Sequence, residues 1–237
     1  MQCLVVEGSP AVRESLCYVL LSCGVKAIPA AGRREALDAL RSSGDIGGAI
    51  IDIDTKEAEG TELIRELKGS ASSRGINLVV HTVQSSRELV EKMMEYGVVG
   101  YLLKPYSEQE LYAKIKKILD RCASHNAERR HIRVKPDPNE LLRLHFKLPG
   151  HPAMISGKII DISVGGVAVE LFNPPAESIL KPGTQIPSIQ FTLSRRQFAP
   201  PGRVILYKEK LLALRFDYLN VAEKSTLARY VFKRISS

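Results

Sequence analysis

The stretch "MISGKIIDISVGGVAVEL" (154–171) decides how the second half of the chain folds. Two apolar runs, "MISGKII" and "VAVEL", flank "DISVGG" (161–166), and this pattern predicts two strands joined by a turn. A simple hairpin is satisfied by one glycine, whereas this turn also carries an aspartate and a serine two residues apart. The turn is therefore a candidate for holding a ligand as well as for reversing the chain.

Further strand patterns, separated by Pro and Gly, surround this hairpin. They lie at residues 141–148, 154–163, 166–172, 186–193, 202–207 and 211–216, and residues 220–235 read as an amphipathic helix. The pattern predicts a small, mainly-β antiparallel barrel or sandwich, followed by a terminal helix.

The first half alternates short β-rich runs with amphipathic stretches of helical length. Predicted strands lie at 3–6, 25–28, 48–52, 76–81 and 99–103, and predicted helices include 10–23, 33–41, 85–96 and 107–122. Ser107 and Glu110 form a capping box at the start of the last helix. The alternation predicts an α/β domain, with a five-stranded parallel sheet and a site at the carboxyl ends of its strands. We place this domain at 1–122 and the second at 123–237, with a linker at about 121–130.

Charge is unevenly distributed along the 237 residues, whose formal net charge is +8. Residues 1–120 carry 15 Lys and Arg against 17 Asp and Glu, whereas residues 121–237 carry 19 against 9. Only the second half is therefore expected to bind an anionic partner, which could be nucleic acid, a nucleotide or a membrane surface.

Other features limit the class of protein. No apolar run reaches the roughly 18 residues of a bilayer span, and the amino terminus lacks a secretory pattern, so we expect a cytoplasmic protein without membrane insertion. The four cysteines lack CxxC spacing and are interpreted as free thiols. The five histidines lack HxxxH or HExxH spacing, so a zinc site is not expected.

Polar residues follow the predicted strands of the first half, where a parallel sheet gathers them at one edge. They are Glu7, Asp52, Asp54, Thr82 and Lys104. A metal ion held by the acids, an aspartate nucleophile and a neutralising lysine make a plausible phosphoryl-transfer site.

This ordered set resembles the receiver domain of bacterial response regulators over about residues 1–120, and the resemblance implies a flavodoxin-like fold. The resemblance implies Asp52 as phosphoacceptor, with Gly60 behind it, and Thr82, Tyr101 and Lys104 as switch residues. It also implies a histidine kinase as partner and a Mg²⁺ site on Glu7 and Asp52. The family's second acid is here Gly8, which weakens Mg²⁺ binding, and "TK" (55–56) replaces the usual Met-Pro. Two interpretations stay open: a degenerate receiver used for docking or dimerisation, or a receiver phosphorylated on Asp52.

Basic residues precede the first strand of the second half. "ERRHIRV" (128–134) places Arg129 and Arg133 four residues apart, with Arg130 adding positive charge. A guanidinium group bonds phosphate or the O6/N7 edge of guanine in a bidentate manner and can stack on a base. In the turn, Asp161 and Ser163 can accept and donate hydrogen bonds, while Gly165 and Gly166 allow the backbone to approach an anion.

RxxxR followed by DxSxxG resembles the PilZ family of cyclic di-GMP receptors, over about residues 126–237. The matching residues are Arg129, Arg133, Asp161, Ser163 and Gly166. The resemblance implies a six-stranded barrel that binds the dinucleotide and catalyses nothing. It favours a signalling adaptor, as a monomer or a homodimer, that acts on a protein partner in motility or biofilm machinery.

A DNA-binding response regulator is the alternative, because receivers often carry such outputs and the second half is basic. The sequence shows no helix-turn-helix pattern and only one convincing helix after residue 121, so we expect no DNA binding.

Overall fold

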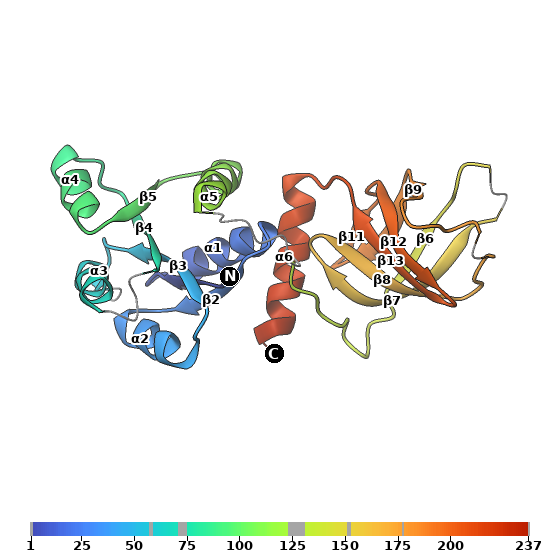
Figure 1. The fold of residues 1–237 in the computed structure, drawn as a ribbon, viewed down its shortest axis with the longest axis horizontal. Helices are drawn as coiled ribbons and strands as arrows, with labels where there is room; N and C mark the ends of the chain where they lie inside the picture. The colour runs from blue at the N-terminus through green and yellow to red at the C-terminus, as the bar shows by residue number, and fades with distance from the viewer. Residues whose placement is uncertain are drawn as a thin grey trace. The chain divides into compact units, whose positions relative to one another are not determined.

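Five parallel strands form the sheet of the first unit in the computed structural model (Figure 1). The structure describes residues 2–56, 59–70, 75–122, 131–150, 153–176 and 178–236, and the chain divides into two units, Met1–Arg129 and Arg130–Ser237. The strands of the first unit are β1 (Gln2–Val6), β2 (Lys26–Ala30), β3 (Ile46–Asp52), β4 (Asn77–Thr82) and β5 (Val98–Leu103). They lie in the order β2-β1-β3-β4-β5, which confirms the predicted parallel sheet and its flavodoxin-like connectivity.

Helices cover both faces of this sheet (Figure 1). They are α1 (Pro10–Ser22), α2 (Arg33–Ser42), α3 (Gly60–Gly69), α4 (Arg87–Glu95) and α5 (Glu108–Cys122). Side chains of α2, α3 and α4 pack on one face around the fully buried Leu4, Ile51 and Val80, and α1 and α5 enclose a small apolar cavity on the other. The predicted capping box is present, since the Glu110 amide donates to Ser107 Oγ at 3.3 Å and the Ser107 amide to Glu110 Oε2 at 2.7 Å.

The second unit is an antiparallel sheet with a terminal helix, α6 (Val221–Ser236). Its strands are β6 (Arg143–Phe146), β7 (Ile155–Ser163), β8 (Gly166–Leu171), β9 (Gln185–Ile186), β10 (Ile189–Leu193), β11 (Arg196–Phe198), β12 (Gly202–Lys208) and β13 (Leu211–Phe216). They lie in the order β11-β10-β6-β7-β8-β13-β12-β9, a curved half-barrel. Across the described residues of the chain, no helix is both long and apolar enough to cross a bilayer.

The sheet contains eight strands rather than the six expected, for two local reasons. The stretch expected to form one strand at 186–193 is divided at Pro187, and its two parts pair with different neighbours, β9 with β12 and β10 with β6. The additional strand β11 follows Ser194 and Arg195, whose positive φ angles of 50° and 63° make a two-residue hairpin back onto β10.

Contacts at both ends fix α6 to the rest of the second unit. Asn220 caps its start by accepting from the Glu223 amide at 2.8 Å, and the Arg196 guanidinium donates to the Ala222 carbonyl at 3.2 Å. Near its other end, Arg234 pairs with Asp137 at 2.7 Å and the Tyr230 hydroxyl donates to Glu140 at 2.6 Å. The segment 137–140 is thereby attached to the helix.

Candidate functional site

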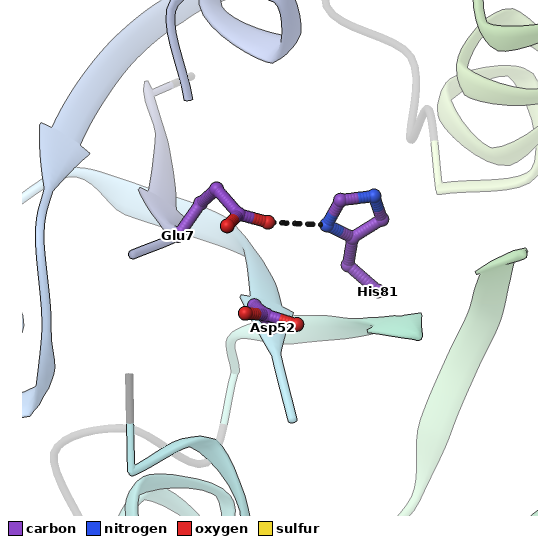
Figure 2. A group of neighbouring side chains, drawn as sticks. All are labelled: Glu7, Asp52 and His81. Atoms are coloured by element: carbon purple, nitrogen blue, oxygen red, sulfur yellow. Dashed lines mark hydrogen bonds and ion pairs between the residues drawn. The ribbon is translucent and has the colours of Figure 1, made fainter. Parts of the chain in front are cut away.

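The strands of the first unit end at one rim, where the sequence predicts a phosphoryl-transfer site. Glu7 follows β1, Asp52 is the last residue of β3, His81 and Thr82 end β4, and Lys104 follows β5. Figure 2 shows the side chains of Glu7, Asp52 and His81 facing one another, and all three are buried. The rim therefore brings together predicted residues from separate strands, with a histidine that the sequence analysis did not select.

Both carboxylate oxygens of Asp52 accept hydrogen bonds. Oδ1 lies 2.8 Å from the Lys104 ammonium and 3.1 Å from the Asp54 amide, and Oδ2 accepts from the Thr55 hydroxyl at 2.6 Å. Burial raises the pKa of Asp52, but the hydrogen bonds from Lys104 and Thr55 outweigh it, so the pKa lies below its usual value. Asp52 is thus held as a buried carboxylate.

Glu7 belongs to a second buried chain of hydrogen bonds. Its Oε1 accepts from the Ser9 amide at 3.0 Å, and its Oε2 lies 2.9 Å from Nδ1 of His81. The other ring nitrogen of His81 lies 2.7 Å from the hydroxyl of Tyr106. Burial raises the pKa of Glu7, yet the hydrogen bonds from His81 and Ser9 bring it below its usual value. His81 therefore connects a buried carboxylate to a phenol.

Lys104 is the cation of this rim. Its Nζ lies 3.4 Å from Glu7 Oε2 and 3.4 Å from Asp54 Oδ2, besides its contact with Asp52. Burial lowers its pKa, but the hydrogen bond to Asp52 and the charge of Glu7 outweigh burial and leave the pKa above its ordinary value. Thr82 joins the rim through Asp54, donating to its Oδ1 at 2.6 Å.

Tyr101, the third predicted switch residue, contacts a different element. Its hydroxyl donates to the Val90 carbonyl in α4 at 3.1 Å, and its ring packs against the core of the first unit. Tyr101 therefore connects β5 to α4 and not to the carboxylates of the rim.

The donor atoms at the rim do not match those that Mg²⁺ prefers. Mg²⁺ takes hard oxygen ligands in octahedral geometry. Gly8 offers no side chain, and the three residues whose ligand atoms lie within 4.8 Å of one another are Glu7, Asp52 and His81. Because one of these ligand atoms is an imidazole nitrogen, the set departs from the all-oxygen set that Mg²⁺ prefers.

A second candidate site lies at the turn of the second unit. The Arg133 guanidinium donates to Asp161 Oδ1 at 2.9 Å, and Val134 forms an antiparallel bridge with Ile162. The pairing of β7 with β8 shifts register between Ile159 and Asp161, so a bulge lies directly before the aspartate and directs its side chain. The structure therefore places the end of the arginine motif beside the turn motif. Arg129 and Arg130 lie outside the described residues.

The other turn residues shape the backbone. Ser163 is buried, donates from its hydroxyl to the Gly166 carbonyl at 3.1 Å and accepts from the Gly165 amide at 3.3 Å. A Cβ on Gly165 would lie 2.3 Å from the ring of His131, and one on Gly166 would lie 2.1 Å from the Leu214 carbonyl oxygen. Ser163 and both glycines thus let the turn lie against His131 on one side and β13 on the other.

A surface groove continues from Asp161. It is lined by residues 135–138, Glu140 and residues 158–161, which include Lys135 and Lys158. The groove therefore has a mixed lining, with Lys135 and Lys158 beside the carboxylates of Asp137, Glu140 and Asp161.

Sequence reasoning missed His81 and Tyr106. The available signal was a histidine at the end of the apolar run "INLVVH" (76–81), directly before Thr82. Searching for histidine pairs within one helix could not find it, because its carboxylate neighbours come from β1 and β3, far away in sequence.

Comparisons with known proteins match the two halves of the chain to two different families. A family model of the response regulator receiver domain matches residues 3–116, and a model of the PilZ domain matches residues 127–233. Among curated proteins, the chain is 30% identical over 121 residues to the phosphate regulon transcriptional regulatory protein PhoB of Escherichia coli, covering 51% of this chain and 52% of PhoB. This chain therefore spans about half the length of PhoB.

Two shorter proteins are also similar. The chemotaxis protein CheY homolog of Campylobacter jejuni is 26% identical over 120 residues, which cover 50% of this chain and 92% of the homolog. The solved PilZ domain with c-di-GMP of YcgR from Escherichia coli has 20% sequence identity and a TM-score of 0.40, over 46% of this chain and 92% of that one.

Proposed function

We propose that this chain, which joins a response regulator receiver domain to a PilZ domain, is a non-enzymatic signalling adaptor that binds cyclic di-GMP through its second half. The proposed ligand residues are the arginines at 129, 130 and 133 together with Asp161, Ser163, Gly165 and Gly166. The receiver half regulates the output or docks a partner, for which we propose a component of motility or biofilm machinery.

The contact between Arg133 and Asp161 carries this proposal. The guanidinium is suited to phosphate or the O6/N7 edge of guanine, and the carboxylate accepts from N–H groups of a base. When no ligand is bound, the guanidinium of Arg133 donates its hydrogen bond to the carboxylate of Asp161. Their side chains are 44% and 31% exposed, so the pair contributes about 0–1 kcal/mol and is opened at small cost.

The charge around the pair supports an anionic ligand. Lys135 and Lys158 line the groove beside Asp161, and Arg129 and Arg130 precede Arg133 in the chain. We propose that Lys135, Lys158 and Arg133 attract the two phosphates of the dinucleotide.

Isothermal titration calorimetry of the full chain with cyclic di-GMP tests the proposal. Arg133→Ala and Asp161→Ala are each expected to weaken binding about 10-fold or more, because a charged hydrogen bond contributes about 1.5–3 kcal/mol. The matched control is Arg33→Ala in the receiver half, which removes an arginine of similar exposure paired with Glu66 and lowers the net charge equally. Equal affinities in all four proteins would refute the assignment.

Cyclic di-AMP separates recognition of guanine from attraction to phosphate. Adenine presents an amino donor where guanine presents the O6 acceptor, so the proposed site binds cyclic di-AMP more weakly. Tight, steeply salt-dependent binding of duplex DNA instead would support the DNA-binding alternative.

The role of the receiver half is tested separately. Asp52 is the proposed phosphoacceptor and a histidine kinase its proposed donor, but both oxygens of Asp52 are buried and hydrogen-bonded. Docking without phosphorylation therefore remains the alternative use of this half. Labelling by acetyl phosphate, followed on a phosphate-affinity gel and absent in Asp52→Asn, would favour a phosphorylated receiver.

A further inference from the structure

We propose that Glu7, Asp52 and His81 bind a divalent transition metal that accepts nitrogen, of the Mn²⁺ or Zn²⁺ type, in place of the Mg²⁺ expected at a receiver rim. The inference concerns the first unit alone and does not depend on the binding of cyclic di-GMP. It starts from His81, a buried imidazole that lies between two buried carboxylates (Figure 2).

The ligand atoms lie close enough for small side-chain movements to bring all three to one metal. One atom from each of the three residues lies within 4.8 Å of the other two, and Nδ1 of His81 is 2.9 Å from Oε2 of Glu7. Metal bonds to imidazole nitrogen and carboxylate oxygen are each about 2.1 Å long, so neighbouring ligands at a right angle lie about 3 Å apart. The nitrogen and oxygen already have the separation of two adjacent ligands.

The outer ring nitrogen of His81 has a fixed partner. A histidine that ligates a metal commonly donates its second N–H to an oxygen, which sets the tautomer and the ring orientation. Here Nε2 lies 2.7 Å from the Tyr106 hydroxyl, so when a metal replaces the Nδ1 proton that is bonded to Glu7, Nε2 can carry the proton of the ring and donate it to Tyr106.

The charge of the rim favours an added cation. Glu7, Asp52 and Asp54 are paired with one ammonium, that of Lys104, among the described residues. Lys104 is 20% exposed, whereas Glu7 and Asp52 are 1% and 0% exposed. The three carboxylates exceed the one ammonium by two negative charges, which a divalent ion beside His81 balances.

Electron paramagnetic resonance of the metal-free full chain titrated with Mn²⁺ tests the proposal. We expect one tightly bound Mn²⁺ per chain, displaced by Mg²⁺ only at a concentration at least about 10-fold higher, because the site includes a nitrogen ligand. Electron spin echo modulation is expected to show coupling to one imidazole ¹⁴N, and His81→Gln should abolish it. His145→Gln, which alters a histidine bonded to Gln190 in the second unit, should leave it unchanged.

Tyr106→Phe provides a second variant that keeps all three ligands. Loss of its hydroxyl is expected to weaken Mn²⁺ binding about 10-fold or more while the ¹⁴N coupling persists. Absence of Mn²⁺ binding, bound Mn²⁺ without ¹⁴N coupling, equal competition by Mg²⁺, or coupling that survives in His81→Gln would each overturn the proposal. If His81→Gln does not fold, the wild-type spectrum and the Tyr106→Phe affinity decide.

Discussion

At the scale of single residues, the two glycines of the turn are required for different reasons. Gly166 faces the backbone of β13, where a Cβ would lie 2.1 Å from a carbonyl oxygen. Gly165 faces the ring of His131, a side chain that can move by changing its rotamer. Gly166 therefore allows β8 to pair closely with β13, and Gly165 allows His131 to lie against the turn.

Alanine substitutions are expected to separate these two roles. Gly166→Ala should lower the free energy of unfolding of the second unit by about 1–3 kcal/mol, because the strand backbone cannot yield without strain. Gly165→Ala should displace His131 and cost less stability, but weaken binding of cyclic di-GMP. Urea unfolding and calorimetry distinguish the variants, and equal losses of stability would contradict this assignment.

The residues of the two candidate sites differed in how far they could be predicted. Asp52, Thr82 and Lys104 end neighbouring parallel strands, and their meeting follows from the connectivity alone. The contact of Arg133 with Asp161 depends on a β-bridge between residues 28 positions apart, which no local pattern encodes. His81 was missed because its partners are set by sheet order and not by spacing along the chain.

At the scale of elements, α6 holds the segment that follows the arginine motif. Val134 is bridged to β7, and Asp137 and Glu140 are bonded to Arg234 and Tyr230 of the helix. The segment between the candidate ligand site and α6 is thus fixed at both ends. Arg133 is therefore connected to the terminal helix by a few residues of chain and by the contacts of Asp137 and Glu140 with Arg234 and Tyr230.

The alkaline stability of the second unit is expected to report on this attachment. Burial, then the hydrogen bond to Glu140, raises the pKa of Tyr230 to about 12. Because the folded state holds this proton more tightly than the unfolded state, its contribution is complete below about pH 10 and is lost as pH rises to about 12.

Tyr230→Phe removes the titrating group and should flatten that decline. Denaturant unfolding of both proteins at intervals from pH 8 to 12, on the same buffer series, measures the difference in slope. Identical slopes would show that Tyr230 does not contribute to the pH dependence of folding.

The strands of the second unit were predicted more reliably than their boundaries. Period-two patterns identified the long strands, since each has one buried face. β9 was merged with β10 because the break at Pro187 lies inside an apolar run, and β11 was missed because strands of two or three residues have no detectable period. β-strand propensity alone does not predict which neighbouring strand each part of such a run will pair with.

At the scale of the whole molecule, the chain folds into two units, and the two halves of its sequence have net charges of opposite sign. Residues 1–120 carry a small excess of acids and residues 121–237 a large excess of bases. Each unit has its own sheet, and each sheet is built only from strands of that unit. The units are therefore expected to unfold as separate cooperative transitions.

Differential scanning calorimetry of the full chain tests this expectation together with the ligand assignment. A ligand at 100 times its dissociation constant stabilises the state that binds it by about 2.7 kcal/mol. Cyclic di-GMP should therefore raise the midpoint of one transition by several degrees and leave the other unchanged. Arg133→Ala should remove the shift, and a shift of both transitions would contradict independent unfolding.

The division of residues 185–193 between β9 and β10 also affects the two edges of the sheet in the second unit. β9 lies at one margin of the sheet and β10 next to the other, yet only Pro187 and Ser188 separate Ile186 from Ile189. Three peptide units span at most about 11 Å, so the covalent chain keeps the margins close even though no ladder of hydrogen bonds joins them among the described strands. The backbone at Pro187 and Ser188 thus links β9, one edge strand of the half-barrel, to β10, and Pro187 offers no amide hydrogen to an added strand at that point.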